Sequence, residues 1–226
     1  MDNSRAIVVI NAPQTARARG RPRAFARDKA LYAAALTFWR LGYEGASIVD
    51  LTAAMGITAQ SLYAAFGSKA ALYEEALDAY QTSIGAYTAR ALAEEPTAIG
   101  AFVRILTESA LEFTRSDQPK GCMISTATLA CAEEHRPLAL KVAALRSDTL
   151  AAFEARLERG IVQGDLEPDA DTGALARFMG AIIQGMSVQA QDGASQSDLM
   201  QIVQIAQAEL SRHGHRDRKA TVPVIT

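Results

Sequence analysis

The stretch ITAQSLYAAFGSKAALYEEAL, residues 57–77, decides the fold. Its apolar side chains recur every three or four residues, a spacing that indicates amphipathic helices. The run breaks at Phe66-Gly67-Ser68, so the pattern predicts a helix of only about two turns, Ala59 to Phe66, followed at once by a longer helix. Thr58 and Ser68 precede these two helices, where a hydroxyl oxygen can accept a hydrogen bond from a free backbone N–H.

The residues upstream predict two more helices. One runs from about Arg27 to Leu41 with Gly42 at its C-terminal cap, and a short one begins at Ser47 and ends at Met55-Gly56. Asp50 stands three residues after Ser47, which is the spacing of a capping box. Two short helices joined by a tight turn form a helix-turn-helix, whose second helix presents its N-terminal end to a major groove about 12 Å wide.

The exposed first turn of that second helix holds Ala59, Gln60 and Ser61. Small residues permit close approach to DNA, and the carboxamide of Gln60 can pair with an adenine edge. The alternative is a first turn that is merely solvated. The helix that opens after Ser68 is expected to continue to roughly Ala89, which would make it a rod linking the two halves of the chain.

Composition places the 226 residues among soluble globular proteins, with 49% hydrophobic and 21% charged residues, and the sequence pattern is all-α. No apolar run approaches the roughly 20 residues that cross a bilayer, so we expect no membrane partner and a cytoplasmic location. Cys122 and Cys131 fit a reducing compartment. If they share a helix they lie about 13 Å apart, beyond the roughly 7 Å reach of a disulfide.

Charge is distributed unevenly. The net charge is −2, yet the first 75 residues are net positive and the rest net negative. The segment ARARGRPRAFARDK, residues 16–29, concentrates the positive side chains and includes Arg17, Arg19, Arg21 and Arg23. A basic arm ahead of a helical unit suits phosphates or a minor groove, although a solvated tail has the same composition. We therefore expect an arm over residues 1–26, a DNA-binding domain over 27–73, a helical domain over 74–213 and a tail over 214–226.

The run GYEGASIVDLTAAMGITAQSLYAAFGSKAALYEEALDAY, residues 42–80, resembles the DNA-binding region of the tetracycline-repressor (TetR/AcrR) family of transcriptional regulators. Several spaced features match together, among them Gly42-Tyr43, Gly56, Leu62-Tyr63 and Phe66. The resemblance implies that Ala59, Gln60 and Ser61 face bases. It also implies that the phosphates are held by Ser47, Thr52, Thr58, Tyr63 and Lys69. Three alternatives stay open: Ser47 only caps its helix, Tyr63 packs inward, and Lys69 is ordinary surface.

The C-terminal half predicts helices near residues 98–115, 122–132, 137–163, 172–191 and 197–212. The last two are unusually apolar, which favours a dimeric four-helix bundle, as the resemblance also implies; a monomeric core is the alternative. The expected interface residues are Phe178, Ile182, Met186, Ile202, Ile205 and Leu210. A pocket for an effector is expected among Phe102, Leu106, Phe113, Cys122, Met123, Thr126, Met179, Ile183 and Gln184, although plain packing gives such a set in any helical core.

Other functional classes lack support in the sequence. There is no metal-ligand spacing or Gly-rich phosphate loop, and Glu133-Glu134-His135 fits a solvated turn better than a catalytic set. An architectural DNA-binding protein would share the N-terminal features but would not need some 130 further folded residues. The sequence therefore predicts a homodimeric regulator, a repressor in preference to an activator, which binds a palindromic operator and is released by an unidentified small molecule, without a cofactor.

Overall fold

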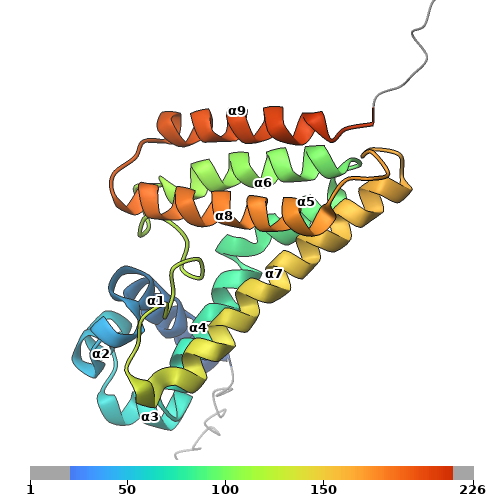
Figure 1. Cartoon of the computed structure of the whole chain (residues 1–226). Helices are drawn as coiled ribbons and strands as arrows, with labels where there is room; N and C mark the ends of the chain where they lie inside the picture. The colour runs from blue at the N-terminus through green and yellow to red at the C-terminus, as the bar shows by residue number, and fades with distance from the viewer. Residues whose placement is uncertain (1–20, 216–226) are drawn as a thin grey trace, which may run out of the picture.

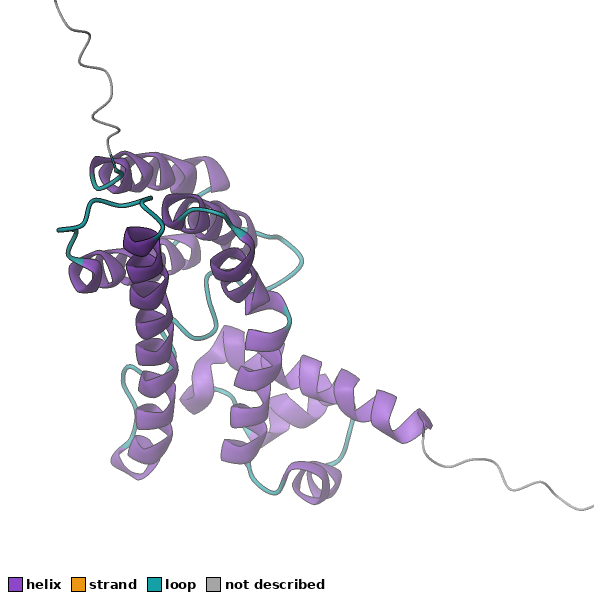
Figure 2. Cartoon of the chain, turned by 90° about the vertical axis from the view of Figure 1, so that its right-hand side faces the viewer, coloured by secondary structure: helices purple, strands orange, loops and turns teal. Residues whose placement is uncertain are grey.

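The computed structural model describes residues 21–215, with side chains from Arg27 onward, and this part of the chain is helical. The prediction of an all-α protein is confirmed; the described residues form no strands beyond an isolated bridge between Leu166 and Gly214. The order of elements is α1 (Arg21–Gly45), α2 (Ile48–Met55), α3 (Ala59–Phe66), α4 (Lys69–Thr82), a 3-10 turn (Ile84–Ala86), α5 (Tyr87–Glu94), α6 (Ala98–Phe113), a 3-10 turn (Glu133–His135), α7 (Arg136–Val162), α8 (Thr172–Gln191) and α9 (Gln196–Arg212). Figure 2 shows these helices joined by loops of different lengths.

The helix starts in the N-terminal half are capped as predicted. Hydroxyl oxygens of Ser47, Thr58 and Ser68 accept hydrogen bonds from the backbone N–H groups three residues ahead, and Ser47 forms a full capping box with Asp50. Gly42 leaves the helical conformation (φ 71°, ψ 172°) and kinks the end of α1. Because such a φ favours glycine, this position ends the regular helix where the sequence indicated.

The start of α1 differs from the prediction. The helix begins at Arg21 and not at Arg27, since Pro22 in a first turn is compatible with a helix. Arg21 and Arg23 therefore belong to α1, which shortens the expected arm, whereas Arg17 and Arg19 lie outside the described residues.

The prediction that the fourth helix continues to roughly Ala89 is wrong, because α4 ends at Thr82. The chain leaves α4 at Ser83 (φ −119°, ψ −92°), turns through residues 84–86 and starts α5 at Tyr87. The hydroxyls of Thr82 and Ser83 both donate to carbonyl oxygens of the last turn of α4, and such bonds compete with helix propagation. The single rod is therefore two helices with a joint at Ser83.

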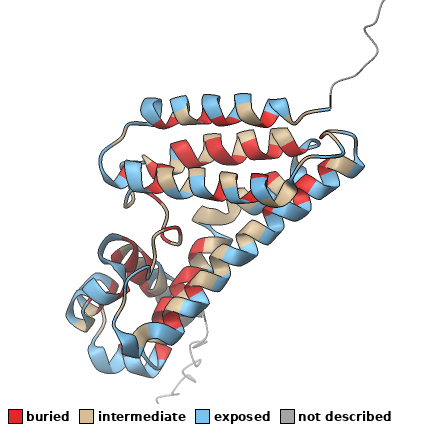
Figure 3. Ribbon diagram, viewed as in Figure 1, coloured by how far each residue is buried: buried red, intermediate tan, exposed pale blue. Residues whose placement is uncertain are grey.

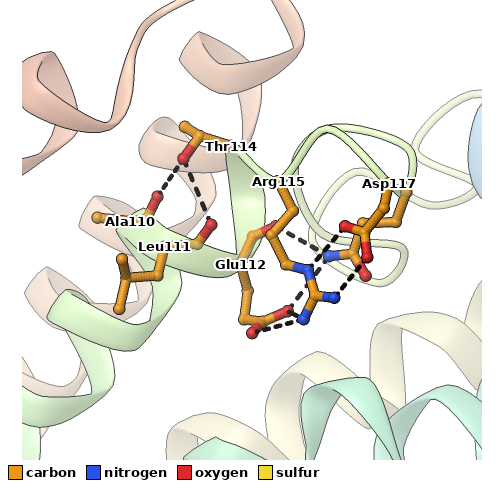
Figure 4. Close-up of polar contacts among 7 residues, drawn as sticks. Ala110, Leu111, Glu112, Thr114, Arg115 and Asp117 are labelled. Atoms are coloured by element: carbon orange, nitrogen blue, oxygen red, sulfur yellow. Dashed lines mark hydrogen bonds and ion pairs between the residues drawn. The ribbon is translucent and has the colours of Figure 1, made fainter.

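The predicted helix over residues 122–132 is absent. These residues belong to a longer segment, residues 114–132, which is a series of turns and which we call the 114–132 linker. At its start Arg115 bridges Glu112 and Asp117 (Figure 4). Further on Gly121 (φ 75°) lies against Ser187 of α8, whose hydroxyl accepts the N–H of Cys122 at 2.8 Å. Several backbone groups of the linker thus bond to other elements, while within it the N–H of Ala127 donates to the carbonyl of Ile124 at 3.2 Å. The other C-terminal helices lie within two residues of their predicted bounds.

Two hydrophobic cores organise the molecule (Figures 1 and 3). The C-terminal core lies among α5 to α9. The N-terminal core joins α1–α4 but also takes in Met123 of the linker and Leu138 and Val142 of α7. The start of α7 is therefore packed on α1–α4, the expected DNA-binding unit, while the remainder of α7 lies in the C-terminal half.

Candidate DNA-binding surface and ligand cavities

The first turn of α3 is exposed. Leu62 and Phe66 are buried and fix the helix, while Ala59, Gln60 and Ser61 are exposed. The Ser61 hydroxyl is 3.0 Å from the Thr58 hydroxyl, so it is engaged locally. Within the described residues the Gln60 carboxamide has no hydrogen-bond partner. Gln60 thus keeps both its donor and its acceptor for an outside group.

Three of the expected phosphate ligands, Thr58 among them, already bond to groups of the helix-turn-helix itself. The Ser47 hydroxyl accepts the N–H of Asp50 and donates to an Asp50 carboxylate oxygen at 2.6 Å. This hydroxyl bond, and a second bond from the Ser47 N–H to the same oxygen, lower the pKa of Asp50. The Thr52 hydroxyl donates to the carbonyl of Ile48 at 2.8 Å. The alternative in which Ser47 caps its helix is therefore realised. Tyr63, with 48% of its surface exposed, is not packed inward.

Lys69 lies over an aromatic ring. Its Nζ is 4.5 Å from the ring centroid of Tyr43, and this partial burial lowers its pKa, against an opposing effect of Glu44. A cation–π contact holds an ammonium group in place without neutralising it. At the N-terminus of α4 the ammonium adds to the positive end of the helix, which suits a phosphate oxygen.

A contact that the sequence did not reveal joins α1 to α4. The Arg27 guanidinium donates to both carboxylate oxygens of Glu75 at 2.8 and 3.0 Å and lies 4.4 Å from the ring centroid of Phe66. Residues 48 positions apart give no sequence signal for such a pair. A single guanidinium nitrogen, Nη2, makes both bonds, and this ion pair connects the helix that precedes the helix-turn-helix with the helix that follows it.

The Glu133-Glu134-His135 cluster is a contact between the two halves. His135 Nδ1 is 2.7 Å from a carboxylate oxygen of Glu44, and the N–H of Ala132 donates to the same oxygen at 3.0 Å. These two hydrogen bonds lower the pKa of Glu44, the bond from His135 more strongly. Since Glu44 also influences Lys69, the start of α7 is electrostatically connected to the candidate phosphate ligand.

A cavity of about 350 Å³, the C-terminal cavity, opens between the α4–α5 joint, α7 and α8. Cys122, Ile183 and Gln184 line it, as do Tyr80 and Arg146, which were not predicted. Phe102, Leu106, Phe113 and Met179 are instead buried in the C-terminal core, where Phe102 packs edge-on against Phe153 of α7. Met123 and Thr126 line a different cavity, beside α1.

Two polar contacts characterise the wall of the C-terminal cavity. Burial raises the pKa of Tyr80, whose hydroxyl donates to the Cys122 sulfur at 3.5 Å. Cys122 and Cys131 are both free thiols. Arg146 donates to the carbonyls of Ala127 at 2.9 Å and Ile124 at 3.3 Å. A side chain of α7 thus holds the 114–132 linker in place.

The apolar face of α8 and α9 is only partly covered. Ile205 has 72% of its surface exposed, and Phe178, Ile182 and Ile202 are half-buried. Met186 and Leu210 are fully buried inside the same chain and so cannot contact a partner, which corrects their place among the expected interface residues. Among the described residues, no helix is long and apolar enough to cross a bilayer.

Comparison with known proteins agrees with this arrangement. Residues 30–76 match the bacterial regulatory proteins of the tetR family, and residues 101–209 match the tetracyclin repressor-like C-terminal domain. The chain belongs to the TetR family of helix-turn-helix transcriptional regulators. This membership excludes the enzyme alternative.

Three relatives are informative. The HTH-type transcriptional repressor ComR of Escherichia coli is 35% identical over 195 residues, which is 82% of this chain and 89% of ComR. The repressor BdcR of the same organism is 28% identical over 179 residues, 79% of this chain and 86% of BdcR. A cysteine mutant of the regulator CifR, solved with 26-bp double-strand operator DNA, is 40% identical with a TM-score of 0.80; the match covers 84% of this chain and 98% of CifR.

Proposed function

We propose that this protein is a transcriptional repressor that binds operator DNA as a homodimer and is released by a small molecule held in the C-terminal cavity. The observation that carries the proposal is the exposed first turn of α3. There the Gln60 carboxamide, which has no hydrogen-bond partner in the described part of the chain, lies on a helix fixed by Leu62 and Phe66. ComR and BdcR are repressors, and the CifR structure contains operator DNA, which supports both repression and operator binding.

The dimer is supported by the incompletely covered face of α8 and α9. Ile205, Phe178, Ile182 and Ile202 lie on these two helices, and pairing with a second copy would remove their apolar surface from water. A two-fold dimer would also present two α3 helices to half-sites about 34 Å apart.

Two helices connect the C-terminal cavity with the DNA-binding unit. α4 carries Tyr80 at the cavity and Lys69 at its other end, about 16 Å away along the helix axis. α7 carries Arg146 at the cavity, and the turn before it contacts Glu44. A molecule that fits only one arrangement of these helices would shift the population toward it, and its differential affinity limits the effect.

The test has two stages. The purified protein is mixed with fragmented genomic DNA, the retained fragments are sequenced, and a shared palindrome is expected. Shift assays with that duplex, with and without metabolite extract, should then show release. Retention of fragments without a shared sequence would favour an architectural DNA-binding protein, and an operator complex that no extract releases would remove the small molecule from the proposal.

A further inference from the structure

The junction between the two halves contains a second cavity, of about 510 Å³, which we call the interdomain cavity. Its walls come from the end of α1, from Tyr73 of α4, from the linker and from the last residue of α8. Trp39 and Arg40 line it on the α1 side, and Lys120 and Thr128 line it on the linker side. Its volume falls within the range of sites for small organic ligands.

Two polar atoms of this lining are buried without a partner. Trp39 Nε1 and Thr128 Oγ1 have no hydrogen-bond partner among the described residues, although most buried polar groups have one. Trp39 is 8% exposed, so water from bulk solvent has little access to its indole. Each unmade hydrogen bond costs free energy, and a ligand that accepts from the indole N–H and bonds to the hydroxyl would recover it.

The backbone at Thr128 adds a third observation. Its φ of 49° is the only positive value among the described residues other than glycine. A β-branched residue rarely adopts this conformation, and strain of this kind concentrates at functional sites. The strained residue is thus one that lines the cavity.

The charge of the lining defines the ligand. Arg40 and Lys120 are cationic, and no Asp or Glu is among the described residues that line the cavity. Leu41, with 40% of its surface exposed, provides apolar surface beside them. A cationic, partly apolar cavity with an indole donor and a hydroxyl suits a carboxylate that carries a hydrocarbon group.

We propose that the interdomain cavity binds a small organic carboxylate, with Trp39 and Thr128 as hydrogen-bonding groups and Arg40 and Lys120 as the compensating charges. The site is distinct from the C-terminal cavity, with which it shares only Cys122 among the described lining residues. Because its walls belong to both halves, a bound carboxylate would fix the DNA-binding unit against the linker.

The chain contains one tryptophan, so its fluorescence reports directly on the site. Benzoate and hexanoate are titrated separately into the full-length protein without DNA at constant ionic strength, with benzamide as the neutral counterpart of benzoate. We expect a saturable change in emission with a carboxylate and none with benzamide at the same concentrations. No saturable response to either carboxylate below about 10 mM, or an equal response to benzamide, would overturn the proposal.

Matched variants locate the binding. Thr128→Val removes the hydroxyl with little change of shape and should weaken carboxylate binding about fivefold to tenfold. Thr149→Val makes the same change in the wall of the C-terminal cavity and should leave the affinity unchanged. Trp39→Phe, followed by calorimetry, should weaken binding to a similar extent as Thr128→Val.

Two results would refute this assignment. Weakening by Thr149→Val alone would place the ligand in the C-terminal cavity. Inorganic phosphate binding as tightly as the carboxylates would show a general anion site. Neither result depends on operator binding, so this test is independent of the proposed function.

Discussion

At the scale of single residues, the DNA-facing surface divides into side chains that serve the helices and side chains that remain available. The hydroxyls of Ser47, Thr52 and Ser61 form hydrogen bonds with nearby groups of the same helix-turn-helix. Gln60 has no partner within the described part of the chain, and Lys69 is held over Tyr43 without an ion pair there. We therefore expect specific reading and charge attraction to rest on different residues.

Gln60→Ala tests specific reading. We expect it to cost roughly 1 to 3 kcal/mol on the best operator and to relax the preference at one position of each half-site. Folding should be unaffected because Gln60 is exposed. The measurement is the dissociation constant on the operator and on its single-base variants. An equal loss on every sequence would mean that Gln60 does not read a base.

Lys69→Ala tests charge attraction. Loss of one phosphate contact per subunit should weaken binding to all duplexes and lower the slope of log K against log salt by about one unit per subunit. Operator affinity measured at several salt concentrations gives the slope. Arg90→Ala, which removes an exposed cation from α5, serves as the control and should leave the slope unchanged. An unchanged slope in Lys69→Ala would make Lys69 ordinary surface.

At the scale of elements, local signals predicted α2 and α3 well and the 114–132 linker badly. Caps and helix-ending glycines act within four residues, so Ser47, Thr58 and Gly56 could be read directly. In the linker, Met123 contributes to the N-terminal core and Cys122 bonds to α8. Apolar spacing cannot distinguish such a segment from a helix, because the partners that remove its backbone from a helix lie far away in sequence.

Gly121→Ala tests how tightly the linker is fastened to α8. A Cβ here would lie 2.7 Å from the carbonyl oxygen of Ser187, at a φ of 75°. Gly164 has a nearly identical φ of 74° with nothing within 4 Å, so Gly164→Ala carries the backbone cost alone. We expect losses in free energy of unfolding of roughly 2–4 kcal/mol for Gly121→Ala and roughly 1–2 kcal/mol for Gly164→Ala. Equal losses of unfolding free energy for the two variants, measured by denaturant melts, would mean that the linker moves away from α8 at little cost.

The contact between Glu44 and the start of α7 should depend on pH. The folded structure lowers the pKa of Glu44, so its stabilisation is complete above the ordinary value of 4.5 and is lost as pH falls through the lower folded value. Glu44→Gln should therefore destabilise most at neutral pH, and the difference from wild type should shrink below pH 4.5. Urea unfolding at several pH values measures this, with Glu158→Gln on the exposed surface of α7 as control. A difference that does not vary with pH would contradict the assigned role.

At the scale of the whole molecule, the cavities were the least predictable feature. The C-terminal cavity takes its wall from α4, α5, the linker, α7 and α8. Phe102 and Phe113 of α6, which we expected in the wall of this cavity, lie in the C-terminal core instead. Helical periodicity identifies which side of each helix is apolar, but it does not say where the packing of several helices leaves a gap. For the same reason Met186 and Leu210 could not be told apart from the surface residues on their helices.

Ile205→Asp tests the dimer. Ile205 is 72% exposed on α9, so a charge there costs little within one chain, but burying it unpaired between two copies is strongly unfavourable. We expect a folded monomer by sedimentation at concentrations where the wild type is a dimer, and a loss of operator affinity of at least about tenfold because the two half-sites are no longer bound together. Val162→Asp makes a comparable change at the end of α7, where the side chain is 87% exposed, and should leave both the dimer and operator binding intact. A dimeric Ile205→Asp variant with full operator affinity would mean that the subunits associate through a different surface.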